Sequence, residues 1–96
     1  MPKKSKSVPK DYAQHKKREA KAIGGRIKNL RIHLGFSQEQ LRIALQLQGI
    51  SISRSQFSRL ESGETVPSAV EIKALASALN VPYSSLMEDH PAQASR

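Results

Sequence analysis

The chain has 96 residues, which is enough for one small domain and leaves little room for a second. Lysine and arginine total 16 against 8 acidic residues, a formal net charge of +8 that favours a polyanionic partner, nucleic acid ahead of an anionic membrane surface. The sequence has no cysteine, so disulfides, zinc–thiolate sites and thiol nucleophiles are excluded. No apolar run approaches the roughly 18–20 residues of a membrane span, so we expect an intracellular protein with no membrane partner.

Most of the excess positive charge lies in the first 22 residues. Eight lysine and arginine residues stand there against Asp11 and Glu19, 8 − 2 = +6, whereas residues 23–96 hold eight against six, 8 − 6 = +2. Because this segment has few large apolar side chains to bury, we expect residues 1–22 to be a flexible basic arm, disordered to about residue 18 in the free protein. An arm that binds phosphates and a tail that only improves solubility are the two alternatives.

From residue 23 onward the apolar residues repeat at helical spacing. Ile23, Ile27, Leu30 and Leu34 fall at i, i+4, i+7 and i+11, which predicts one face of a first helix. Gly35 follows directly, in the position where a left-handed residue commonly ends a helix. The first predicted helix therefore ends near residue 34.

Two adjacent glycines, Gly24 and Gly25, lie near the start of this helix. Each costs about 1 kcal/mol relative to alanine inside a helix, which predicts a frayed start. Alternatively, Gly24 allows another helix to approach closely.

Three capping boxes predict the starts of three further helices. In this motif a serine at the N-cap and a glutamine or glutamate three residues later satisfy each other's backbone N–H groups. The three pairs are Ser37–Gln40, Ser53–Gln56 and Ser68–Glu71. The second predicted helix reaches about Leu47, the third runs through Leu60, and the fourth follows the apolar stripe Ile72, Leu75, Ala76, Leu79. A short fifth helix from Tyr83 to Glu88 and a frayed tail, 89–96, complete the prediction.

The connection between the second and third predicted helices admits two interpretations. Apolar and polar residues alternate from Leu45 to Ile52 around Gly49, which fits an extended segment or a small hairpin. We prefer a loop in which Ile50 and Ile52 fill the core. The prediction is then an all-α domain of five helices over residues 23–88.

The start of the third predicted helix carries polar side chains suited to DNA. Unpaired N–H groups and the positive end of the helix dipole favour phosphate there, and arginine can reach base edges. Phe57 and Leu60 occupy the inward face at i and i+3, so the remaining residues must point outward. Those outward residues are Ser53, Arg54, Ser55, Gln56 and Arg59.

Four motifs occur in order: I-G-x-R-I-x-x-L-R from Ile23, G-F-S-Q-E-Q-L from Gly35, S-R-S-Q-F-S-R-L-E from Ser53 and E-x-G-x-x-x-P-S from Glu61. Together they resemble the Cro/C1-type helix-turn-helix regulators, the XRE family, which includes phage repressors. The resemblance implies a compact five-helix, phage-repressor-like domain that binds double-stranded DNA at specific sequences and regulates transcription. It also implies a location in the cytoplasm, at the nucleoid.

The resemblance implies a role for each matching residue. The residues that match base contacts are Arg54, Ser55 and Arg59. Gln56 matches a cap or phosphate contact, and we expect it to face bases together with these three. The residues assigned to the DNA backbone are Ser37, Gln38, Arg42 and Ser53. Arg31 and Glu61 match an internal salt bridge between the first helix and the end of the third.

Three features depart from the family's pattern. The stretch from Gln38 to Glu61 is longer than the commonest form and resembles a subgroup with a lengthened turn. Arg42 stands where a small alanine is usual, and it either points to solvent or adds a phosphate contact. Glu64 stands where a basic phosphate-binding residue is often found.

Other functions stay open as alternatives. An antitoxin-like or adaptor module would use the same fold to hold a partner protein, and a non-specific nucleoid or membrane-surface binder would act through the arm alone. A homodimer would form through the fifth helix and the Ile50 region, or only on DNA. His33 is the one histidine of the predicted domain, and no pattern around it indicates a metal ligand set, a catalytic site or a cofactor.

Overall fold

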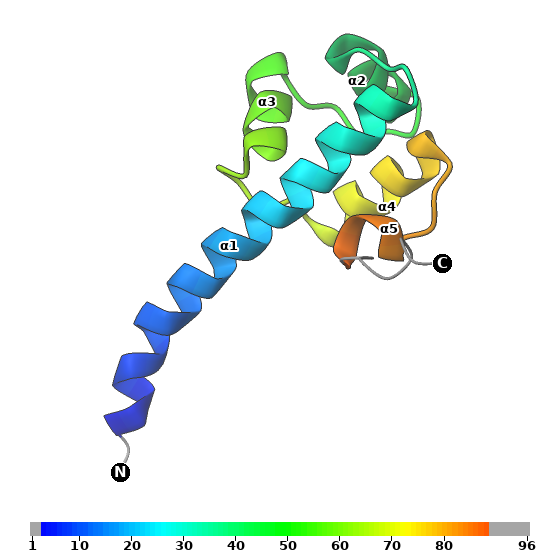
Figure 1. Cartoon of the computed structure of the whole chain (residues 1–96). Helices are drawn as coiled ribbons and strands as arrows, with labels where there is room; N and C mark the ends of the chain where they lie inside the picture. Colours follow the sequence, from blue (N-terminus) through cyan, green and yellow to red (C-terminus); the bar gives the residue numbers. More distant parts are fainter. Residues whose placement is uncertain (1–2, 89–96) are drawn as a thin grey trace, which may run out of the picture.

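The computed structural model describes residues 3–88, with side chains from residue 12 onward. Within this range it contains five helices and no strand, so the all-α prediction is confirmed (Figure 1). The predicted tail, 89–96, lies outside the described residues. The helices are α1 (Lys3–His33), α2 (Gln38–Gln46), α3 (Arg54–Ser62), α4 (Ala69–Leu79) and α5 (Ser84–Met87).

The first helix begins far earlier than the sequence predicted. Residues expected to form a flexible arm are the first turns of α1, which projects from the body of the molecule (Figure 1). Lysine, arginine, alanine and glutamine, which make up most of residues 13–22, are good helix formers, and lengthening a helix that is already packed needs no new nucleus. The packed part also starts before residue 22, because Ala20 is only 3% exposed. The expectation of disorder counted large apolar residues and so overlooked this alanine.

Helices α2, α3 and α4 begin where the capping boxes predicted that they would. All three capping boxes are present with both of their hydrogen bonds. In the first, the Gln40 N–H donates to Ser37 Oγ over 3.0 Å, and the Ser37 N–H donates to Gln40 Oε1 over 2.9 Å. At the end of α1, Gly35 has φ 85°, and the Phe36 N–H donates to the Arg31 carbonyl over 2.9 Å. This is the left-handed ending that Gly35 predicted.

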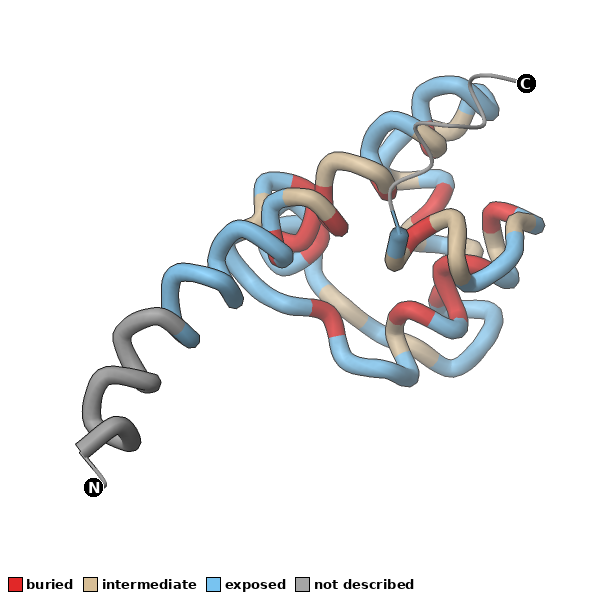
Figure 2. Tube along the Cα trace, turned by 60° about the horizontal axis from the view of Figure 1, so that its bottom comes forward, coloured by how far each residue is buried: buried red, intermediate tan, exposed pale blue. Residues whose placement is uncertain are grey.

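The core lies where the second half of α1 meets the other helices (Figure 2). Ile50 and Ile52 pack against it from the connection between α2 and α3, which confirms a loop in place of a hairpin. Leu34 was predicted to face inward but is 45% exposed, because the chain leaves the helix at His33 and turns at Gly35. The largest fully buried side chains are Ile27, Leu41, Leu45, Phe57, Ile72, Leu75 and Leu86.

Two glycines allow α1 to lie directly on the end of α3. A Cβ atom at Gly24 would fall 2.8 Å from the carbonyl oxygen of Glu61 and still closer to that of Leu60. A Cβ atom at Gly63 would fall 2.6 Å from the Cα of Lys21. The structure thus supports close approach as the reason for Gly24, and this contact fixes the position of α3 against α1.

Candidate nucleic-acid interface

The exposed face of α3 carries the polar residues that the sequence singled out. Phe57 and Leu60 are buried on the opposite face, as predicted from their spacing. The Arg54 side chain is 80% exposed on the first turn, and that of Arg59 is 50% exposed further along. The other exposed residues of α3 and its N-cap are Ser53, Ser55, Gln56, Ser58 and Ser62.

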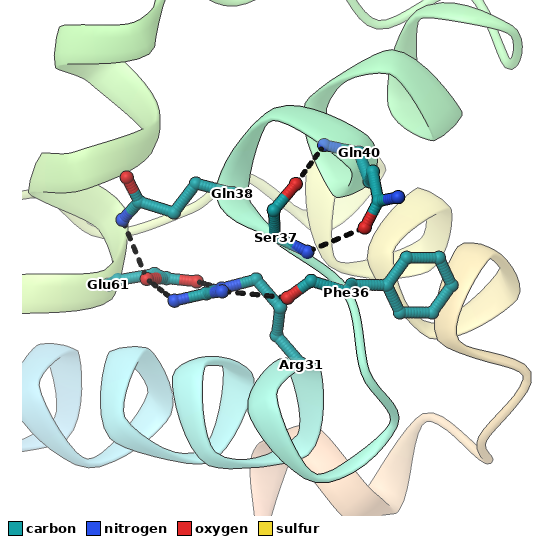
Figure 3. A network of polar contacts seen from close by, with 6 residues as sticks. All are labelled: Arg31, Phe36, Ser37, Gln38, Gln40 and Glu61. Carbon is teal, nitrogen blue, oxygen red and sulfur yellow. Dashed lines mark hydrogen bonds and ion pairs between the residues drawn. The ribbon is translucent and has the colours of Figure 1, made fainter.

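A buried ion pair fixes α3 to α1 and α2 (Figure 3). Arg31 donates to Glu61 from Nε over 2.6 Å and from Nη2 over 3.1 Å, and its Nη1 donates to the Phe36 carbonyl over 2.8 Å. Gln38 Nε2 donates to the same carboxylate over 2.9 Å. With several hydrogen bonds around it, this buried charge pair is well compensated, and it links three helices at one point.

A second cluster joins the start of α2 to the start of α3. Glu39 accepts hydrogen bonds from Arg42 Nη2 over 2.6 Å and Nε over 3.3 Å, and from Arg54 Nε over 3.4 Å. The hydrogen bond from Arg42 is the main cause that lowers the pKa of the Glu39 carboxyl below its ordinary value, and the charge of Arg54 acts in the same direction. Glu39 thus holds both arginines near one another at the surface. Sequence reasoning missed Glu39, although its i, i+3 spacing to Arg42 was visible.

A hollow of about 400 Å³ lies between the starts of α2 and α3. It brings together four of the residues assigned to DNA, namely Ser37, Gln38, Arg42 and Arg54, and Glu39 also lines it. Two others, Gln56 and Arg59, line a separate hollow of about 220 Å³ further along α3.

The capping boxes leave specific hydrogen-bond donors at this surface. Ser37 Oγ and Ser53 Oγ each accept an N–H of their own helix, which leaves the two hydroxyl hydrogens to donate outward. Gln56 Oε1 accepts the Ser53 N–H over 2.8 Å, so Nε2 is the part of that amide that can donate to another molecule. Among the described residues no group of histidine and acidic side chains is arranged to hold a metal ion.

A family model described as a helix-turn-helix domain matches residues 22–86, more than half of the chain. The chain belongs to the helix-turn-helix domain family. No curated protein and no solved structure matches it. In a helix-turn-helix unit the second helix lies in the DNA major groove while the first crosses the backbone. The two consecutive helices α2 and α3 correspond to the first and second helix of such a unit.

The connection between the two helices of this helix-turn-helix is long, and hydrogen bonds fasten it at both ends. Gln48 Nε2 donates to the Ala74 carbonyl over 3.2 Å, next to Gly49, where φ is 88°. At the other end Arg42 Nη1 donates to the Ile52 carbonyl over 3.1 Å. The Arg42 side chain is 23% exposed, so it braces the connection rather than extending into solvent.

No helix in the described part of the chain combines the length and apolar character needed to cross a bilayer.

Proposed function

We propose that this helix-turn-helix protein binds double-stranded DNA at specific sequences and regulates transcription, as a Cro/C1-type regulator. The observation that carries the proposal is the placement of Arg54, which extends from the first turn of α3 while Glu39 and Arg42 flank it. An exposed arginine on a helix that is rigidly packed behind is the arrangement that base recognition requires.

In this proposal α3 lies in the major groove. An α-helix such as α3 is about 10–12 Å across with its side chains, which fits the roughly 12 Å width of that groove. Arg54 and Arg59 would each donate two hydrogen bonds to guanine O6 and N7, the commonest specific contact. Ser55 and the Nε2 of Gln56 supply shorter donors for neighbouring base edges.

The start of α2 would contact the phosphate backbone. Gln38 uses one amide hydrogen on Glu61, and the second remains for a phosphate oxygen. The hydroxyl groups of Ser37 and Ser53 add donors at two helix N-termini, where negative charge is favoured. Arg42, in the same hollow, adds positive charge.

The test compares the affinity of variants for a preferred duplex, selected from a random pool, and for an unrelated duplex. We expect Arg54→Ala and Arg59→Ala each to lose about 1–3 kcal/mol on the preferred duplex and to lose base preference at one position. Lys73→Ala is the matched control, because Lys73 is an exposed cation on α4 that lines neither of the two hollows. Equal discrimination by the parent and both arginine variants would refute the assignment.

A further inference from the structure

A positively charged groove lies outside the two hollows that face the predicted DNA contacts. Its volume is about 720 Å³, and it runs between the middle of α1 and the end of α3. Lys17, Arg18 and Lys21 line it from α1, and Ser62, Gly63 and Glu64 line it from the end of α3. The α1 residues are all exposed, so their charges face solvent.

The α1 wall of this groove is held in place by packing. Ala20 is buried between the groove-lining residues of α1, and the backbone at Lys21 touches Gly63 closely enough to exclude a Cβ atom there. Lys17 and Lys21 are four residues apart and therefore share one face of the helix. A flexible tail would present its cations in many positions, whereas this helix presents them at a fixed distance from α3.

The groove lies at the end of the helix that is proposed to read bases. Ser62 is the last residue of α3, and its hydroxyl donates to the carbonyl of Arg59 over 3.2 Å. A helix that lies in the major groove has a phosphate strand on either side of it. The cations of α1 lie beside the end of α3.

The charge of the groove suits a phosphate strand. Its lining contains Lys17, Arg18 and Lys21 against Glu64, so 3 − 1 = +2. Arg59 Nε lies 3.9 Å from Glu64 Oε1, which offsets the one negative charge. The groove is therefore net positive, although Glu64, which follows the end of α3, contributes one negative charge.

We propose that this groove is a second DNA-backbone anchor, which binds a phosphate strand beside the end of α3. The inference rests on the proposed function for the orientation of the duplex. The residues that bind the phosphate strand are Lys17, Arg18 and Lys21. Because this part of α1 is helical, it holds them at fixed positions beside the end of α3.

The test measures how the affinity of the full chain for duplex DNA falls with salt concentration. The affinity falls as salt rises, and each lost phosphate contact makes the plot of log K against log salt less steep by about 0.9. We expect the plot to become less steep by about 1 for Lys17→Gln and by about 2 for Lys17→Gln/Lys21→Gln, with the preferred sequence unchanged. Lys73→Gln removes the same charge from an exposed position on α4 and should leave the slope as it is in the parent. Circular dichroism should show unchanged helix content, because glutamine is a helix former comparable with lysine.

The outcomes separate this inference from the proposed function. A parent that prefers one sequence, with an unchanged slope in the double variant, overturns the groove as an anchor and leaves base reading by α3 in place. The opposite result is a parent with no preferred sequence and a salt dependence that is less steep in the double variant but not in Lys73→Gln. That result overturns the proposed function and supports the groove as a phosphate site.

Discussion

Gly24 and Gly25 are neighbours on α1, and substituting alanine at each should change stability in opposite directions. At Gly25 an added Cβ atom would have no other atom within 4 Å. At Gly24 it would lie 2.8 Å from the carbonyl oxygen of Glu61 and closer still to that of Leu60. Both variants gain the same helix propensity, so their difference measures the contact between α1 and α3.

The magnitude follows from these surroundings. Gly25→Ala should raise the free energy of unfolding by about 0.5–1 kcal/mol, through helix propensity alone. Gly24→Ala gains the same amount but overpacks a contact with backbone atoms, which cannot move aside as a flexible side chain would. Overpacking costs typically 1–3 kcal/mol, and the upper end applies here, so we expect a net loss of about 2 kcal/mol. A displaced α1 would also lengthen the 2.6 Å contact between Arg31 and Glu61.

Thermal unfolding followed by circular dichroism measures this difference. For a chain of this size 1 kcal/mol corresponds to about 4–8 °C, so the two midpoints should differ by roughly 10–20 °C. Equal midpoints, or a higher one for Gly24→Ala, would refute the close contact between α1 and the end of α3.

Three further predictions concern the polar contacts around α3. Glu61→Gln leaves the buried charge of Arg31 without its counterion and should cost about 3–5 kcal/mol in urea unfolding, and a loss under 1 kcal/mol would contradict that role. Ser53→Ala removes the cap of α3 and should cost about 1 kcal/mol, whereas Ser58→Ala, on the exposed face of the same helix, should be nearly neutral. The pKa of Glu39 is lowered in the folded protein from its ordinary value of 4.5. Its contribution to stability is therefore present above the unfolded-state pKa and is lost as the pH falls through the lower, folded-state pKa. The melting temperature of Glu39→Gln should therefore fall less than that of the parent between pH 5 and 3 (about the range in which carboxylates titrate), and parallel curves would contradict it.

Much of the fold could be predicted from local chemistry alone. Each capping box depends on a serine and a partner three residues later, so sequence spacing was sufficient to place the starts of α2, α3 and α4. The outward position of Arg54 followed in the same way from Phe57 and Leu60 on the opposite face. These features are local in the chain, and no tertiary contact overrides them.

Contacts between distant segments were harder to predict. The packed part of α1 begins at Ala20, which is buried, and at Lys21, whose backbone lies against Gly63. Alanine gives little signal in a pattern of large apolar residues. Glu39 belongs to the candidate interface because the chain brings Arg54 to it from 15 residues away. The hydrogen bond from Gln48 to Ala74 crosses 26 residues, and nothing in the spacing of the lengthened turn indicates it.

Selection from a random pool of duplex DNA, with the parent and Arg54→Ala in parallel, tests base reading by α3 most directly. It should be done at about 150 mM salt, where binding through phosphate contacts alone is weak. Base reading predicts that the parent enriches one sequence, and that Arg54→Ala loses the preference at one position and keeps the rest. Enrichment of no sequence by the parent, or of the same full sequence by both proteins, would contradict it.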